Sequence, residues 1–240
     1  MPEYTPRKQF EGLHSRIKRW AVIVAHRRAG KTVACVMDLL NFALATEKQA
    51  ARYAYIAPYY SQAKATAWDY LKFYSRDIAT KVSESELSVE LFNGSRVRLY
   101  GADNPDALRG IYLDGVVMDE FADMRASVWG EIIRPLLADR KGWAVFIGTP
   151  KGKNAFYELW QRAKTDPDWY TVMLRASETG LVGADELKDA RKSMTDSQYE
   201  QEFECSFDAA IVGSVYGKDI AHARMGQRIG KVPHEPAKLV

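Results

Sequence analysis

The chain has 240 residues, of which 47% are hydrophobic and 27% are charged, a composition typical of one large globular domain or two small ones. The net charge of +3 is too small to indicate a partner. No apolar run approaches the ~20 residues that cross a bilayer, and no apolar secretory core opens the sequence, so we expect neither a membrane protein nor an exported one.

The first residues are basic, with eight Lys and Arg residues and two acids within residues 1–31. Such a segment can face the phosphates of a nucleotide or of DNA, or it can be an ordinary solvated surface. The amide of Gln9 offers a donor and an acceptor together, so it could read an adenine edge, although a surface glutamine is the simpler interpretation. An amphipathic pattern predicts a short helix over residues 14–19.

The most informative stretch follows. An apolar run over residues 20–25 precedes a short basic loop, and then Gly30, Lys31 and Thr32 open a helical pattern over residues 33–48. This order of strand, loop and helix is typical of a phosphate-binding loop, because backbone N–H groups and a helix N-terminus supply fixed positive dipoles. In such a loop Lys31 reaches the β- and γ-phosphates, and the Thr32 hydroxyl ligates Mg²⁺.

One position departs from the usual pattern of such loops. Ala25 stands where G-x-x-x-x-G-K-[ST] has its first glycine. Alanine is small, but it tolerates a positive φ poorly. The motif is therefore supported by the order of strand, loop and helix around it rather than by a match at every position.

The next elements are also predicted from periodicity and turn residues. We expect a buried strand over residues 52–57, and a helix from residue 59 to about residue 74 with Ser61 as its N-cap. Alternating apolar residues around Asn93-Gly94 predict a hairpin over residues 87–100. Further on we expect a helix over residues 126–139 that Pro135 kinks or restarts.

The last elements follow from the same signals. Buried strands are expected over residues 143–147 and 169–174, a helix over residues 154–163, and acidic helical structure over residues 184–204 with a break at Thr195-Asp196.

A second chemical centre follows a short apolar strand over residues 116–118. Asp119 and Glu120 are adjacent carboxylates at the end of this buried strand, where they are costly unless they have a role. In a phosphate-loop enzyme Asp119 would hold Mg²⁺ and Glu120 would orient and deprotonate the attacking water. The alternative is a solvated acidic pair at the start of a helix. At the tip of the later strand, Thr149 could sense the γ-phosphate, or it could belong to an ordinary Gly/Pro turn.

Five features occur in one order: Gln9, the loop over residues 27–32, Leu108-Arg109-Gly110, Asp119-Glu120 and Gly148-Thr149-Pro150-Lys151-Gly152. Over roughly residues 7–212 this set resembles the ATPase domain of the large subunit of tailed-bacteriophage terminases. The resemblance implies an α/β fold of the RecA-like ASCE P-loop NTPase class, with a mainly parallel central sheet flanked by helices and a small helical lid. It also implies ATP hydrolysis that drives double-stranded viral DNA into a procapsid.

The resemblance also implies roles for particular residues. The catalytic residues would be Glu120, Lys31 and Arg109, and Thr149 would couple the γ-phosphate to motion. Mg²⁺ would be held by Thr32 and Asp119. Phosphoryl transfer also favours one more cation, an arginine finger, which we expect from Arg109 acting on a neighbouring subunit rather than from Arg27 or Arg28 within the chain. The alternative is that Arg109 only pairs with a local carboxylate. The residues implied to bind ATP are Gln9, Arg27, Arg28, Ala29, Gly30, Lys31, Thr32 and Val33.

By the same resemblance we expect a P-loop ATPase core over residues 1–175, a helical lid or linker over residues 176–212, and a tail or linker over residues 213–240. The implied partners are double-stranded DNA, the portal protein and the terminase small subunit. The implied assembly is a homo-oligomeric ring, a pentamer, on the procapsid in the host cytoplasm, and a monomer in isolation. No acidic trio on strands follows residue 208, so we expect no nuclease activity from this chain.

Two alternatives remain open. A superfamily 2 helicase-like translocase also carries a phosphate loop and an Asp-Glu pair, but the roughly 90 residues after Thr149 are too few for the second RecA-like domain that it needs. A catalytically silent nucleotide- or DNA-binding docking module is the other alternative. The intact Lys31, Thr32, Asp119 and Glu120 argue against it.

Overall fold

The computed structural model describes residues 2–208 and Gly226. The expected tail over residues 213–240 lies outside the described residues, apart from that glycine. Among the described residues, no helix combines the length and the apolar character that crossing a membrane requires.

The centre of the fold is an eight-stranded sheet with the order β3-β4-β5-β2-β6-β7-β1-β8. From β5 to β8 all neighbours are parallel, whereas β3 and β4 join the sheet antiparallel at one edge. The predicted α/β fold with a mainly parallel sheet is therefore confirmed. The strands are Trp20–Ala25 (β1), Arg52–Ala57 (β2), Ala79–Ser83 (β3), Ser88–Leu91 (β4), Arg96–Gly101 (β5), Gly115–Asp119 (β6), Trp143–Gly148 (β7) and Trp169–Leu174 (β8).

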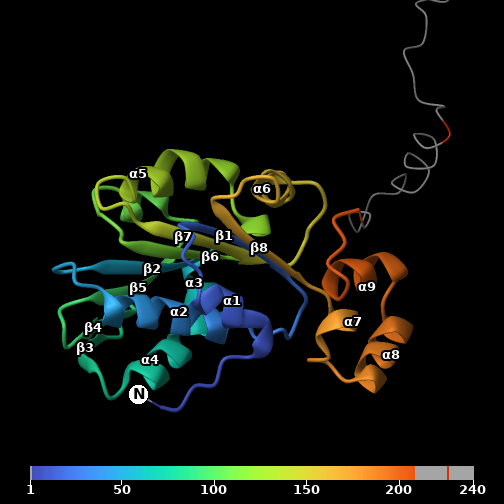
Figure 1. Cartoon of the computed structure of the whole chain (residues 1–240), viewed down its shortest axis with the longest axis horizontal. Coiled ribbons are helices and arrows are strands. Elements are labelled where there is room, and N and C mark those ends of the chain that lie inside the picture. The colour runs from blue at the N-terminus through green and yellow to red at the C-terminus, as the bar shows by residue number, and fades with distance from the viewer. Residues whose placement is uncertain (1, 209–225, 227–240) are drawn as a thin grey trace, which may run out of the picture.

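Helices cover both faces of the sheet (Figure 1). One face carries α1 (Glu11–His14), α2 (Lys31–Ala45), α3 (Tyr60–Ala63) and α4 (Asp69–Ser75), and the other carries α5 (Arg134–Leu136) and α6 (Ala155–Ala163). The central strands are apolar on both faces, because both faces are buried. In β1, for example, Ile23 belongs to the core beneath α2, and its neighbours Val22 and Val24 belong to the core on the other face.

The helices α7 (Ala176–Thr179), α8 (Ala184–Ser193) and α9 (Asp196–Glu202) lie together beyond the end of β8, at the edge of the sheet (Figure 1). The break predicted at Thr195-Asp196 is confirmed. Thr195 caps α9 through a capping box with Gln198, which ends one helix and starts the next.

Several local predictions are confirmed. The hairpin turns at Asn93-Gly94, where Gly94 has a φ of +77°, and β4 pairs with β5. The helix expected around Pro135 is restarted there, because a π-helical turn over Val128–Ile133 passes into the short α5. Asn154 caps α6 by accepting hydrogen bonds from the backbone of Phe156 and Tyr157.

Other predictions are wrong. No helix covers residues 14–19, because α1 ends at His14 and the buried Arg16 turns inward to an ion pair with Asp38 of α2. Ser61 is not an N-cap. Tyr59 occupies that position without a side-chain hydrogen bond, and a π-helical turn over Lys64–Trp68 separates α3 from α4. The edge strand β3 was not predicted, because its mostly polar and exposed residues lack an alternating pattern.

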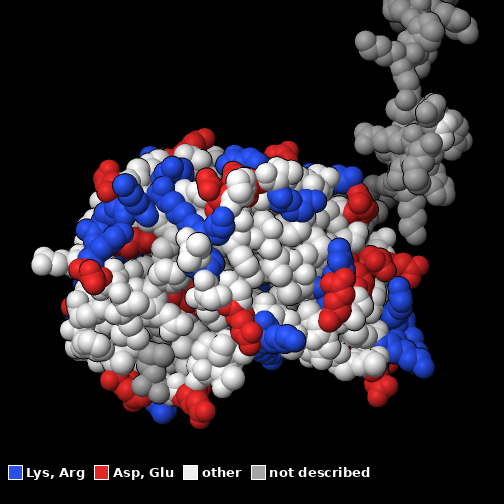
Figure 2. All heavy atoms as spheres, viewed as in Figure 1, with Lys and Arg blue, Asp and Glu red and all other residues white. Residues whose placement is uncertain are grey.

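Basic side chains gather over one end of the sheet. Figure 2 shows Lys and Arg concentrated where β2 begins. The register pairs Arg52 of β2 with Arg96 of β5, and the guanidinium groups of Arg52 and Arg140 lie over the ring of Tyr112. Arg96 is also paired with Glu90 across the neighbouring strand, at 3.1 Å. This basic end is the opposite end of the sheet from the phosphate loop, which follows the carboxyl end of β1.

Candidate active site

The loop between β1 and α2 owes its shape to two residues with a left-handed backbone. Arg28 has a φ of +66° and Gly30 a φ of +93°. Ala25 remains in the extended strand, where it pairs with Leu174 of β8, so this position does not require a positive φ. The substitution of alanine for the usual first glycine is therefore compatible with the loop.

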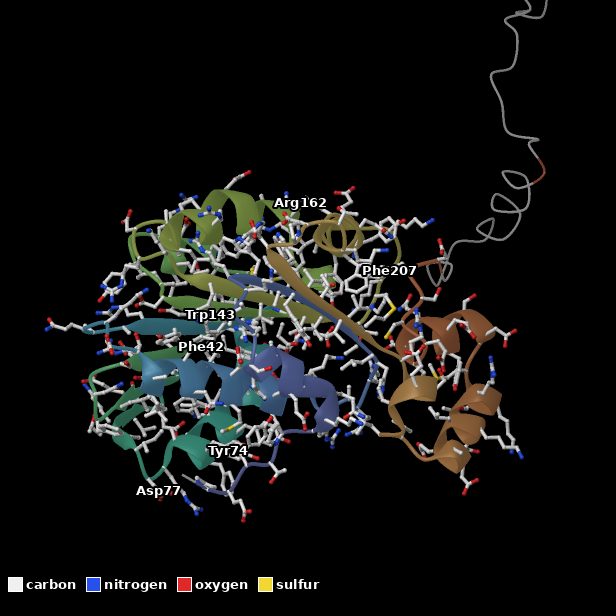
Figure 3. All side chains as sticks on the ribbon, in the orientation of Figure 1. Phe42, Tyr74, Asp77, Trp143, Arg162 and Phe207 are labelled. Carbon is white, nitrogen blue, oxygen red and sulfur yellow. The ribbon has the colours of Figure 1, made fainter. Side chains whose placement is uncertain are left out.

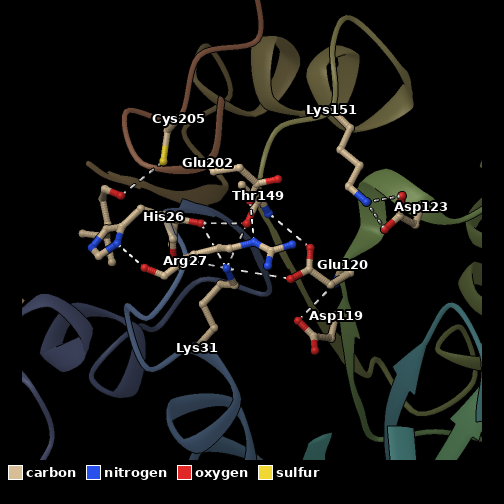
Figure 4. A network of polar contacts seen from close by, with 12 residues as sticks. His26, Arg27, Lys31, Asp119, Glu120, Asp123, Thr149, Lys151, Glu202 and Cys205 are labelled. Carbon is tan, nitrogen blue, oxygen red and sulfur yellow. Dashed lines mark hydrogen bonds and ion pairs between the residues drawn. The ribbon is translucent and has the colours of Figure 1, made fainter. Parts of the chain in front are cut away.

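The ammonium group of Lys31 joins three elements of the fold (Figure 4). Its Nζ donates to the carbonyl oxygens of Ala25 at 3.1 Å and His26 at 3.3 Å, and to the hydroxyl of Thr149 at 3.1 Å. Its Nζ also lies 3.8 Å from Oε1 of Glu120. The structure thus places the lysine beside the ends of both β6 and β7.

Asp119 is buried at the end of β6, and both of its carboxylate oxygens have partners. Oδ1 accepts a hydrogen bond from the backbone N–H of Glu120 at 3.0 Å, and Oδ2 accepts one from the hydroxyl of Tyr55. Burial raises the pKa of Asp119 to about 6, and the negative charge of Glu120 adds to the rise.

Glu120 adopts a left-handed backbone with a φ of +49°, which is unusual for a residue with a side chain. Its Oε2 faces the backbone N–H of Thr149 at 3.4 Å. A Cβ added to Gly148 would lie 3.3 Å from the Cα of Glu120, so a side chain there would require the Glu120 backbone to shift by a few tenths of an ångström. Strained backbone of this kind concentrates at functional sites, where it aims a side chain.

Lys31, Glu120 and Thr149 border one cavity of about 370 Å³, whereas Asp119 is not among its lining residues. Sequence reasoning missed Gln62, Asp123 and Glu202. Gln62 could have been found, because loops after the carboxyl ends of parallel strands meet at one edge of a sheet and Gln62 follows β2 closely. The residues that line the cavity are Arg27, Arg28, Lys31, Gln62, Glu120, Asp123, Thr149, Lys151 and Glu202.

Two cations of this cavity are already paired in the structure. Arg27 Nε lies 2.6 Å from Oε2 of Glu202 in α9, and the backbone N–H of Arg27 donates to the carbonyl of the same glutamate at 3.0 Å. Lys151 Nζ lies 2.6 Å from Oδ2 of Asp123. The loop is therefore tied to the helical segment that follows β8.

A second cavity, of about 400 Å³, shares Arg28 and Lys31 with the first. Its other lining residues are Arg7, Ala29, Gly30, Thr32, Val33 and Tyr70. The two cavities together border the whole loop and the first turn of α2.

The structure places Gln9 apart from both cavities. Its Nε2 donates to the carbonyl of Thr179 at 2.9 Å, and it lines a separate cavity beside β8. Thr179 in turn contacts Nε2 of His26 through its hydroxyl at 2.9 Å, so hydrogen bonds through these two residues link Gln9 to the loop.

Arg109 does not line the cavity of its own chain. Its side chain is 65% exposed, and its Nε pairs with Oδ1 of Asp106 at 2.9 Å. The local carboxylate is therefore one real partner of this arginine, and the exposed position leaves it accessible to another molecule.

The oxygen groups near Lys31 fit a magnesium ion bound together with a nucleotide. Mg²⁺ prefers oxygen ligands, and in nucleotide sites one or two carboxylates suffice because phosphates and water complete its shell. Thr32 and Asp119 supply a hydroxyl and a carboxylate. Within residues 2–208, no group of three or more His, Cys, Asp or Glu side chains forms a ready-made metal site.

Comparison with known proteins identifies the family. The family model "Terminase large subunit, T4likevirus-type, N-terminal" matches residues 22–217. The chain belongs to this terminase family.

Individual relatives agree with this assignment. The terminase chain is 54% identical to the terminase large subunit of Thermus phage G20c over 65 residues, which cover 27% of this chain and 13% of that protein. It is 25% identical to the terminase large subunit of Escherichia phage T5 over 196 residues, covering 79% of this chain and 44% of that protein. The chain thus spans less than half the length of the curated relatives that it matches.

The fold has a close counterpart among solved structures. The large terminase ATPase domain of Thermus phage P74-26 superimposes with a TM-score of 0.74 and 26% identity, covering 85% of this chain and 94% of that domain. The RecA-like fold implied by the sequence resemblance is therefore confirmed for this terminase chain.

Proposed function

We propose that the chain hydrolyses ATP and that this hydrolysis powers the translocation of double-stranded viral DNA into a procapsid. The observation that carries the proposal is the meeting of Lys31, Glu120 and Thr149, from three different elements, at one cavity. The solved relative from phage P74-26 is described as an ATPase domain, which supports the same reaction.

In this proposal the triphosphate lies along the loop between β1 and α2. Lys31, now held by carbonyl oxygens and the Thr149 hydroxyl, turns to the β- and γ-phosphates. The backbone N–H groups of the loop and of the first turn of α2 bind the remaining phosphate oxygens. The nucleotide-binding set is Arg27, Arg28, Ala29, Gly30, Lys31, Thr32 and Val33, with Gln9 as the adenine contact implied by the resemblance.

Thr32 and Asp119 would hold Mg²⁺. When bound, the ion neutralises phosphate charge and orients the γ-phosphate. Asp119 suits this role because its two oxygens are already oriented by the Glu120 N–H and the Tyr55 hydroxyl.

Glu120 serves as the general base. Its carboxylate borders the cavity near Lys31 and the N–H of Thr149, so a water between it and the γ-phosphate can lose a proton to it. Thr149 contacts both the lysine and the end of β1, since its hydroxyl also donates to the carbonyl of Ala25 at 3.3 Å. It is therefore suited to transmit loss of the γ-phosphate to β7.

Arg109 supplies the arginine finger to a neighbouring subunit in a ring, because it is exposed and absent from its own cavity. Arg27 and Arg28 are the alternatives within the chain, since both line the cavity. The ring, taken as a pentamer, would act at the portal protein with the terminase small subunit in the host cytoplasm.

The test measures ATP binding and phosphate release on the same preparations. Lys31→Ala should abolish turnover and weaken ATP binding, whereas Glu120→Gln should lower kcat by about 10²–10⁴ and retain binding. Glu158→Gln, the same chemical change at an exposed position of α6, is the matched control and should change neither quantity. Turnover within tenfold of the native rate in Glu120→Gln would show that Glu120 is not the base. ATP-dependent thermal stabilisation without phosphate release by the native chain would favour the silent docking module.

A further inference from the structure

The hydroxyl of Tyr55 is a buried polar group in the middle of the sheet. Tyr55 lies on β2 and is 0% exposed, so its hydroxyl must find partners inside the protein. It donates to Oδ2 of Asp119 on β6. Burial raises the pKa of Tyr55 well above its usual value, so the phenol stays protonated and remains a donor at neutral pH.

The topology explains how the two residues meet. β2 and β6 are parallel neighbours, and Tyr55 lies opposite Val117 in their register. Asp119 is two residues further along β6 and therefore points to the same face as Val117. Diagonal neighbours across a strand pair are within reach of a long aromatic side chain.

The same face carries α2 and its first turn. Tyr55 belongs to the core beneath α2, together with Ala34 and Cys35 of that helix. Through its hydroxyl it contacts the carboxylate of Asp119, one of the two groups that would hold Mg²⁺. It lines neither of the cavities that border the loop, so it acts through that carboxylate.

We propose that Tyr55 is a positioning residue for the magnesium-binding carboxylate: its hydroxyl fixes the rotation of the Asp119 side chain. The inference rests on the proposed ATPase function. Outer hydrogen-bond partners of metal ligands typically contribute 10- to 100-fold in metal affinity, because without them the ligand must be ordered when the metal binds.

The same strand offers a matched control. Tyr53 lies two residues earlier on β2, on the same face and 3% exposed, but its hydroxyl donates to the carbonyl of Phe42 at 3.1 Å. Tyr53→Phe and Tyr55→Phe each remove one buried hydroxyl from one strand. If the Tyr55 hydroxyl had only a structural role, the two variants should have a similar Mg²⁺ dependence.

The experiment titrates Mg²⁺ against binding of the fluorescent analogue mant-ATP, and repeats the binding in EDTA. Tyr55→Phe should bind mant-ATP like the native chain in EDTA, but should need about tenfold more Mg²⁺ for the half-maximal metal effect. Its kcat at saturating Mg²⁺ should approach the native value. Tyr53→Phe should keep the native Mg²⁺ midpoint.

An unchanged Mg²⁺ midpoint in Tyr55→Phe, with the native chain active, overturns the inference and leaves the ATPase proposal intact. Absence of Mg²⁺-dependent binding and of hydrolysis in the native chain contradicts the ATPase proposal itself. Thermal unfolding of both variants is measured first. If Tyr55→Phe unfolds at the assay temperature, the titration is done in the cold with a stabilising osmolyte, where the same shift is expected.

Discussion

Arg16, in the segment before β1, forms a buried ion pair with Asp38 of α2, and removing this pair should change the free energy of unfolding measurably. Arg16 Nη1 lies 2.8 Å from Oδ1 of Asp38, and each side chain is 1% exposed. The guanidinium lies over the rings of both Phe42 and Trp143, which pack against each other between α2 and β7 (Figure 3). His14 is the other neighbour of the Asp38 carboxylate, at 3.3 Å.

Replacing Arg16 alone with methionine leaves the carboxylate of Asp38 buried without its cation. Breaking a buried pair from one side typically costs about 3–5 kcal/mol. At about 2–4 °C per kcal/mol for a chain of this size, the melting temperature of Arg16→Met should fall by roughly 10 °C.

The double variant Arg16→Met/Asp38→Leu should recover most of this loss. Both charges are then absent, and three buried atoms that lack a hydrogen-bond partner in the native structure, Nε and Nη2 of Arg16 and Oδ2 of Asp38, are removed with them. Apolar replacement of a whole buried pair is often neutral or stabilising.

The measurement is the free energy of unfolding in urea for the native chain, the single variant and the double variant. Arg175→Met, which breaks the exposed pair with Glu178, is the control and should cost no more than about 1 kcal/mol. The reasoning would be refuted if Arg16→Met lowered the free energy of unfolding by less than about 1 kcal/mol, or if the double variant were as unstable as the single one.

Two further predictions concern the loop and the ring. Burial lowers the pKa of His26, so the folded state binds fewer protons than the unfolded state, and the associated stability should be present above the unfolded pKa of about 6.5 and lost as the pH falls below it. In urea unfolding between pH 5 and pH 8, the free energy of unfolding should fall less steeply toward acid pH in His26→Gln than in the native chain. Equal pH dependence in the two proteins would contradict this account. If Arg109 acts on a neighbour, the isolated chain should be a slow, monomeric ATPase, and mixing Arg109→Ala with Glu120→Ala should partly restore phosphate release under assembly conditions. No restoration with assembly confirmed by light scattering, or fast turnover by a proven monomer, would favour an arginine within the chain.

Local patterns predicted the elements that carry the chemistry. The strand before Ala25, the helix that begins near Lys31, and the acidic pair after an apolar strand all depend on residues close in sequence. The turn at Asn93-Gly94 and the break before Asp196 are also local, because each rests on the conformational preference of one or two residues. Such features are confirmed where the structure describes them.

Predictions failed where a distant contact overrode a local preference. Residues 14–19 have an amphipathic pattern, but the ion pair of Arg16 with Asp38 holds that segment out of a helix. Gln62 and Glu202 stand in no recognisable motif, and they border the cavity only because β2 ends there and α9 returns to the loop. The approach of Gln62 follows from its place just after β2, whereas no sequence spacing indicates that Glu202 returns to the loop.

From the sequence alone we could identify a phosphate loop and an acidic pair, each at the end of an apolar strand. The folded chain was needed to show that Lys31 and Glu120 border one cavity, that the Tyr55 hydroxyl donates to Asp119, and that Arg109 lies outside that cavity. The difference comes from the sequence separation over which each preference acts. Strand and turn preferences act over a few residues, whereas the order β2-β6-β7-β1 is set by how the whole chain buries its apolar faces.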